Sequence, residues 1–141
     1  MAEEPGTAQP PAALELLPAG PVSLRLPAPA SKSVTNRALL CAALAEGTST
    51  LSGAAPGDDA DAMAAALAAL GAQVDTAAGP TRWAVAGTGG RLLSPDRPLD
   101  ARLSGTTMRF LAAAATLTAE GATVTGQAPL LRRPVGPLVA A

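Results

Sequence analysis

The sequence predicts an α/β fold built from repeated units. From residue 22 onward, strand-like and helix-like segments follow in the order strand, helix, strand, helix, strand, strand. Apolar residues that alternate indicate strands, and apolar residues that recur every third or fourth position indicate helices. Small or hydroxyl residues with a cation nearby open helices in both halves of the sequence. We therefore expect one complete unit and a second unit that the chain end cuts short.

The first strand and the first helix frame a stretch of hydroxyl and basic residues. Val22–Leu26 alternates apolar and polar residues, which predicts a strand that Pro27 ends. Residues 33–46 repeat apolar residues at helical spacing, and Gly47 supplies the stop. The N–H groups at the start of such a helix can face an anion.

The rest of the first unit is read from the residues that start and stop its elements. Asp58 or Asp59 is a natural N-cap for a second helix, and Gly71 ends that helix. The expected elements are a short strand at 48–51, a helix at 60–70, and two strands at 73–76 and 83–86 joined by a turn around Gly79 and Pro80.

The second unit is expected to begin after a loop at residues 87–98. A threonine hydroxyl of the stretch Ser104-Gly105-Thr106-Thr107 would cap a helix at 108–117. A strand at 122–125 follows. The stretch Arg132-Arg133-Pro134 then leads into a last helix, with its proline suited to the first turn.

Composition excludes several kinds of chemistry. The chain has 141 residues, with 10 basic and 11 acidic, so no basic surplus indicates a nucleic-acid or membrane partner. Histidine is absent, which excludes Ser-His-Asp and Cys-His catalysis and His-containing metal sites. The single cysteine, Cys41, lies in an apolar helical run, which favours a buried, inert thiol. Hydrophobic residues make up 48% of the chain but aromatics only 1%, so we expect a thin core that packs against something else.

The N-terminal residues resemble neither a signal peptide nor a membrane anchor. Residues 1–20 are rich in Pro and Ala, which predicts a flexible leader ahead of one folded region at 21–141. They lack the basic start and apolar centre of a signal peptide. No apolar run approaches the roughly 20 residues of a membrane span. A cytoplasmic location is the expectation.

Three stretches could each hold an anion. Ser31-Lys32-Ser33 with Arg37 combines hydroxyls and cations at a helix start, without the glycines of a P-loop. Ser104–Thr107 with Arg109 repeats that design, and the adjacent Arg132 and Arg133 could clamp a phosphate or carboxylate. Each stretch taken alone also fits an ordinary capped helix or solvated arginines. Three in one nearly neutral chain favour a binding site.

The same stretches, in this order, resemble the 5-enolpyruvylshikimate 3-phosphate synthase family. The family signature P-G-S-K-S-x-[ST]-N-R-A-L-L corresponds to Pro29–Leu40, and its N-x-G-T-x-x-R stretch corresponds to Leu103–Arg109. Arg133–Leu138 is similar to the R-P-[IM]-x-x-L stretch. The resemblance implies a fold of two domains made of βαβαββ units, of which this sequence would hold part of the first and none of the second. It also implies a monomer.

The resemblance implies a transferase that moves the enolpyruvyl group of phosphoenolpyruvate onto the 5-hydroxyl of shikimate 3-phosphate and releases phosphate. No metal or organic cofactor would be needed, and glyphosate would compete at the phosphoenolpyruvate side. Residues at positions that match the family motifs would bind one or both of the two substrates. Lys32, Ser33 and Arg37 would hold shikimate 3-phosphate; Lys32, Gly105 and Arg133 would hold phosphoenolpyruvate; Asp59 and Thr106 are further candidates.

Two departures and two alternatives accompany the resemblance. Ala30 replaces the usual Gly, and Leu103 replaces the usual Asn, which removes one polar contact on the phosphoenolpyruvate side. The residues that serve proton transfer in the family would lie outside this sequence, so we expect no catalytic residue and no turnover from this chain alone. The alternatives are the related UDP-N-acetylglucosamine enolpyruvyl transferase and a non-catalytic domain that binds anions or assembles with another polypeptide.

Overall fold

The computed structural model describes residues 13, 15, 17, 18 and 20–140. The flexible leader predicted for residues 1–20 falls mostly outside these residues, as does the end of the predicted last helix. Within the described residues, no helix is long and apolar enough to cross a membrane. The predicted α/β class is confirmed, since helices and two sheets alternate along the chain.

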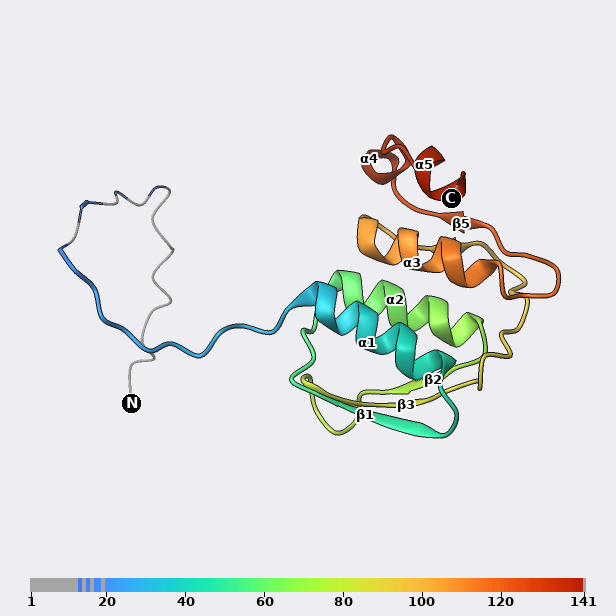
Figure 1. The fold of residues 1–141 in the computed structure, drawn as a ribbon, viewed down its shortest axis with the longest axis horizontal. Coiled ribbons are helices and arrows are strands. Elements are labelled where there is room, and N and C mark those ends of the chain that lie inside the picture. Colours follow the sequence, from blue (N-terminus) through green and yellow to red (C-terminus); the bar gives the residue numbers. More distant parts are fainter. Residues whose placement is uncertain (1–12, 14, 16, 19, 141) are drawn as a thin grey trace, which may run out of the picture.

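The predicted strand at Val22–Leu26 is wrong. This segment is an extended chain that leads into the first helix from outside the folded body (Figure 1). Its apolar side chains are largely exposed, with 74% of Val22, 68% of Leu24 and 74% of Leu26 accessible. Alternation selects a face, but a strand also needs a partner for its N–H and C=O groups, and no described strand pairs with this segment.

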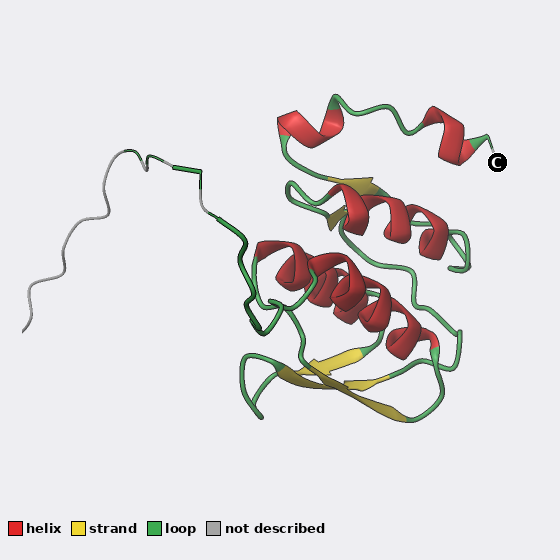
Figure 2. Cartoon of the chain, turned by 60° about the vertical axis from the view of Figure 1, so that its left-hand side comes forward, coloured by secondary structure: helices red, strands yellow, loops and turns green. Residues whose placement is uncertain are grey.

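The main sheet has three antiparallel strands. Strand β3 (Arg82–Ala86) lies in the middle, between β1 (Thr48–Ser52) and β2 (Gln73–Asp75). Alternation along β3 buries Trp83 and Val85 under the helices. Figures 1 and 2 show helices α1 and α2 covering one face of this sheet.

Helices α1 (Lys32–Leu44) and α2 (Asp58–Ala69) carry most of the core. Large buried side chains come from Leu39 on α1 and from Met63 and Leu67 on α2, with alanines between them. These alanines allow close helix packing but remove little area each, so the core is thin as predicted. Gly57 precedes α2, so the aspartates predicted as its N-cap are instead its first residues.

The remaining elements form a smaller layer beyond α1 and α2 (Figure 1). Strand β4 (Leu99–Asp100) runs parallel to β5 (Val124–Thr125), and α3 (Gly105–Ala115) is the crossover between them. Two short helices, α4 (Ala128–Leu131) and α5 (Gly136–Val139), end the described chain. Neither β4 nor α4 was predicted from the sequence.

Two smaller predictions were also wrong. The last helix, α5, begins at Gly136 with Pro137 in its first turn, whereas Pro134 was expected there. Cys41 is exposed on α1 and not buried, because the buried side of that helix is formed by Thr35, Asn36, Leu39, Ala42 and Ala43. The helical spacing of small residues around Cys41 was too uniform to show which side packs.

Candidate functional site

The starts of helices α1, α2 and α3 lie together at one end of the molecule. All three helices begin at the same side in Figure 1, and each contacts the other two. A buried polar contact joins them, because Asn36 Nδ2 donates to Thr107 Oγ1 over 3.0 Å. The Thr107 hydroxyl in turn lies 3.2 Å from the backbone oxygen of Asp59, to which it donates. Free N–H groups and the positive ends of three helix dipoles therefore converge on one region.

A cleft of about 670 Å³ opens in this region. It gathers residues from the first, second and third helices and from the segment after α4. Its lining residues are Lys32, Ser33, Asp59, Leu103, Gly105, Thr106, Arg109, Phe110 and Arg133. The structure thus brings together every substrate-binding residue proposed from the sequence, and both further candidates, with the exception of Arg37.

Arg37 lies one helical turn beyond Ser33 on α1. Its side chain is exposed, and it is not among the residues that line the cleft. The four-residue spacing does place Ser33 and Arg37 on adjacent turns of one helix, but the cleft ends before the second turn. A role of Arg37 in substrate binding stays a prediction.

Lys32 and Asp59 form an ion pair inside the cleft. Lys32 Nζ lies 3.5 Å from Asp59 Oδ2, with 67% of the Lys32 side chain and 26% of the Asp59 side chain exposed. An ion pair this open to water is worth roughly 0–1 kcal/mol. An incoming anion can therefore displace Asp59 from Lys32 at little cost.

The start of α3 is shaped for close contact with a cation. Ser104 is its N-cap, with the side-chain oxygen accepting from the N–H of Thr107 at 3.2 Å, so the predicted threonine cap is wrong. Gly105 follows as the first helical residue. A Cβ at Gly105 would lie 2.9 Å from Arg133 Nη1, so the absent side chain leaves the space that the Arg133 guanidinium occupies.

Arg109 is a cleft residue that the family resemblance did not assign to a substrate. It follows Gly105 by one turn of α3, so both face the cleft. Its Nη2 donates to the backbone oxygen of Pro134 over 3.4 Å, which ties the guanidinium to the segment that carries Arg133. The spacing of Arg109 after Ser104–Thr107 was the signal for this position.

The charged side chains of the cleft are suited to binding an anion, but not to proton transfer. Three cations, Lys32, Arg109 and Arg133, face one carboxylate, Asp59. That carboxylate is already paired with Lys32. The described residues contain no group of three or more His, Cys, Asp or Glu side chains that could hold a metal ion. The cleft can neutralise and orient anionic groups, and it offers no second carboxylate for acid–base work.

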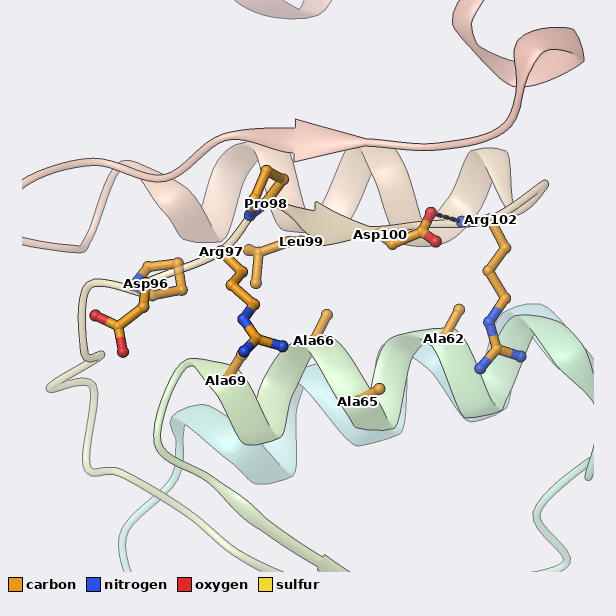
Figure 3. A pocket seen from close by; sticks show the side chains of 11 residues that line it. Ala62, Ala65, Ala66, Ala69, Asp96, Arg97, Pro98, Leu99, Asp100 and Arg102 are labelled. Carbon is orange, nitrogen blue, oxygen red and sulfur yellow. Dashed lines mark hydrogen bonds between the residues drawn. The ribbon is translucent and has the colours of Figure 1, made fainter.

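A second cavity of about 630 Å³ lies between α2 and residues 95–102 (Figure 3). Its floor is a row of alanines from α2, and it contains none of the binding residues proposed from the sequence. Arg102 at one end pairs with Asp58, and the hydrogen bond to Asp58 raises the pKa of Arg102. We therefore take the cleft at the helix starts as the candidate site.

Comparison with known proteins finds the same family over most of the chain. Residues 17–141 match the family model described as EPSP synthase (3-phosphoshikimate 1-carboxyvinyltransferase). A similar curated protein is the 3-phosphoshikimate 1-carboxyvinyltransferase of Rhizobium etli (strain CIAT 652), 47% identical over 131 residues. These residues are 92% of this chain and 31% of that relative. The 3-phosphoshikimate 1-carboxyvinyltransferase of Serratia proteamaculans (strain 568) is 44% identical over 89% of this chain and 30% of the relative.

The fold is also similar to that of a solved structure. An EPSP synthase from Acinetobacter baumannii superposes with a TM-score of 0.72 at 31% sequence identity. The superposition covers 79% of this chain and 26% of that chain. The chain therefore spans about a third of the length of the relatives that it matches.

Proposed function

The chain belongs to the EPSP synthase family, and from this premise we propose that it forms part of an enolpyruvyl transferase active site. The proposed reaction joins the 5-hydroxyl oxygen of shikimate 3-phosphate to the enolpyruvyl carbon of phosphoenolpyruvate. The carbon–oxygen bond to the phosphate of phosphoenolpyruvate breaks, inorganic phosphate leaves, and the hydroxyl gives up its proton. The product belongs to the shikimate pathway of aromatic amino acid biosynthesis.

The observation that carries the proposal is the meeting of Lys32 and Arg133 in one cleft. The two residues are far apart in the sequence, yet both line the space at the helix starts. Two anionic substrates must lie side by side for this transfer, and two cations from separate elements could hold one each. Lys32 would contact both substrates from its position beside Asp59.

We assign the two sides of the cleft to different substrates. The side formed by α1 would hold shikimate 3-phosphate through Lys32 and Ser33, with Arg37 reaching parts of the substrate beyond the cleft. The side formed by α3 would hold phosphoenolpyruvate through the backbone N–H of Gly105 and the guanidinium of Arg133. Both assignments use the N–H groups of a helix start to bind an anion.

The charges present in the cleft predict weak binding by the 141-residue chain. Micromolar affinity requires about 8 kcal/mol. An exposed ion pair contributes roughly 0–1 kcal/mol, and a hydrogen bond to a charged group about 1.5–3 kcal/mol. Lys32, Arg109 and Arg133 are all exposed to water, so their contributions lie toward the weak end of these ranges and fall short of that total. We expect millimolar binding and no turnover, because the cleft offers no second carboxylate for acid–base work.

Titration of the 141-residue chain with shikimate 3-phosphate, followed by NMR, tests the proposal. Lys32→Ala should weaken the binding several-fold and up to about tenfold, since it removes the cation assigned to both substrates. Arg82→Ala is the matched control, because Arg82 is exposed on β3 and does not line the cleft. Equal affinities for the parent and Lys32→Ala would remove Lys32 from the proposed site.

The same titration separates the alternatives. Tighter binding of UDP-N-acetylglucosamine than of shikimate 3-phosphate would favour the related transferase. Equal binding of inorganic phosphate and shikimate 3-phosphate would favour a non-catalytic anion-binding domain. A coupled phosphate-release assay that shows steady turnover by the 141-residue chain would overturn the expectation that it is inactive alone.

A further inference from the structure

We infer that Asn36 is a positioning residue for the cleft, and that it acts through the hydroxyl of Thr107 to set the relative positions of the starts of α1, α2 and α3. The part of this inference that concerns substrate affinity rests on the proposed function. The part that concerns the positions of the helix starts does not depend on any substrate. Neither side chain lines the cleft, so neither is expected to touch a ligand.

The contacts form a closed circuit between three helices. On α1, Asn36 follows Lys32 by four residues, and its Nδ2 donates to Thr107 Oγ1 on α3 over 3.0 Å. Thr107 donates to the backbone oxygen of Asp59 on α2 over 3.2 Å. The Asp59 carboxylate completes the circuit, because its Oδ2 lies 3.5 Å from Lys32 Nζ on α1. Each link joins residues that lie at, or one turn from, the start of a different helix.

Burial makes the hydrogen bonds of Asn36 and Thr107 strong and makes their loss costly. Asn36 and Thr107 are both 0% exposed. A hydrogen bond away from water is electrostatically stronger, and a broken one leaves its polar groups unsolvated. A shift of α1 against α3 would break the Asn36–Thr107 bond, so the pair penalises displacement in a way that the surrounding alanines and leucines do not.

Stability alone does not account for an asparagine at this position. None of the described residues donates a hydrogen bond to Asn36 Oδ1, although Asn36 is fully buried. An unpaired buried carbonyl oxygen costs free energy that an apolar side chain of the same size would not. A buried polar group that costs stability is best attested where it fixes one register between helices. The residues that gain from such a register here are Ser33, Gly105 and Thr106, which line the cleft from α1 and α3.

Small displacements matter at a site of this kind. Groups that bind an anion through helix N–H groups must be held within about 0.5 Å of their working positions. The Thr107 side chain lies two residues after Gly105, and its own N–H is capped by Ser104. Loss of the Thr107 hydroxyl contact would therefore release the start of α3 and the N–H groups assigned to phosphoenolpyruvate.

The test compares Thr107→Val, which removes the hydroxyl at nearly constant shape, with Thr107→Ser, which keeps it. Amide ¹H–¹⁵N shifts are recorded without ligand, and dissociation constants are measured for phosphoenolpyruvate and shikimate 3-phosphate. In Thr107→Val we expect shifted amides for Ser33, Gly105 and Thr106 and affinities about three- to tenfold weaker. In Thr107→Ser both should return toward the parent values, because the hydrogen bonds are kept.

Thr118→Val is the matched control. Thr118 is also buried, and its hydroxyl donates to Ala115 O over 2.8 Å at the other end of α3. A loss of stability in this variant without shifts at Ser33 and Gly105 would support the inference. Shifts of equal size at those amides in Thr118→Val and Thr107→Val would overturn it, since the effect would then be general loosening.

Asn36→Leu gives a second route to the same contact. If the circuit positions the helices, Asn36→Leu and Thr107→Val should shift the same amides, and the double variant should add little to either. Additive shifts would overturn the inference, and so would unfolding of both single variants by circular dichroism, which would make the contact structural. If the parent binds neither substrate, the proposed function fails while the ligand-free amide shifts still decide the role of Asn36.

Discussion

The guanidinium of Arg133 occupies the space that a side chain at Gly105 would fill. A Cβ built on Gly105 would lie 2.9 Å from Arg133 Nη1 and 3.8 Å from Arg109 Nη1. The position of the Arg133 guanidinium therefore depends on the absence of a methyl group at Gly105, whereas Arg109 would make only an ordinary van der Waals contact with it. This relationship makes Gly105 the most informative position for testing the side of the cleft that is proposed to hold phosphoenolpyruvate.

Gly105→Ala should weaken phosphoenolpyruvate binding several-fold and leave shikimate 3-phosphate binding nearly unchanged. The new methyl group must displace Arg133, which is a flexible side chain, so the fold should tolerate it. Ala also favours the helix by up to about 1 kcal/mol over Gly. Calorimetric titration with each substrate checks the difference. Gly136→Ala is the control, since it also begins a helix and has open space around it; equal losses in both variants would contradict the assignment.

Asp59→Asn should strengthen anion binding about two- to fivefold, because it removes the carboxylate that pairs with Lys32 at 3.5 Å. The gain should shrink at high salt, where charges in an open cleft are screened. Phosphate titrations at two ionic strengths measure it. Asp61→Asn serves as control, as Asp61 is also an acidic residue in the first turn of α2 but does not line the cleft. Weaker binding by Asp59→Asn would show that Asp59 contributes a favourable contact.

Arg102→Gly should be more stable than Arg102→Ala by about 1 kcal/mol in the free energy of unfolding. Arg102 has a φ of 51°, a left-handed conformation that costs a residue with a Cβ and costs glycine little. Both variants lose the ion pair with Asp58, so that loss cancels in the comparison. Urea unfolding of the two variants measures this difference in the free energy of unfolding. Equal stabilities would mean that the left-handed backbone is relaxed once the side chain is gone.

Ser104→Ala should cost more stability than Ser31→Ala. Both serines cap a helix, but Ser104 is buried and accepts from Thr107 N at 3.2 Å, whereas Ser31 is exposed and accepts from Val34 N at 3.4 Å. Loss of a cap costs about 0.5–2 kcal/mol, and water can replace only the exposed one. Thermal or urea unfolding compares them. The reverse order would show that burial of the Ser104 cap does not increase its contribution to stability.

Most elements could be read from the sequence because local rules decide them. Apolar spacing and glycine stops located α1 and α2 to within a few residues, and the hydroxyl-rich start at residues 104–107 located α3. Strand β4 was not predicted, because its two residues form a strand only by pairing with β5, some 25 positions later in the sequence. The strand predicted at Val22–Leu26 is the opposite case. Its alternation of apolar and polar residues is clear, but no described strand pairs with it.

The candidate site was recognised in pieces, and the structure joined them. Each motif identified a helix start with a cation nearby, but sequence spacing cannot say that Lys32 and Arg133 share one cleft. It also cannot show that the cleft ends before Arg37. The circuit through Asn36 and Thr107 could not be predicted for the same reason, since a buried hydrogen bond between two helices leaves no local pattern in the sequence. These features depend on tertiary packing alone.

The exposed Val22–Leu26 segment also bears on how the isolated protein behaves at high concentration. An extended, apolar, unpaired segment is a template on which a second extended chain can pair. Pro27 and Pro29 lack backbone N–H groups, so they limit how far such pairing can spread toward α1. We therefore expect reversible, concentration-dependent association of the 141-residue chain, measurable by light scattering, that Leu24→Lys abolishes while the folded body stays unchanged.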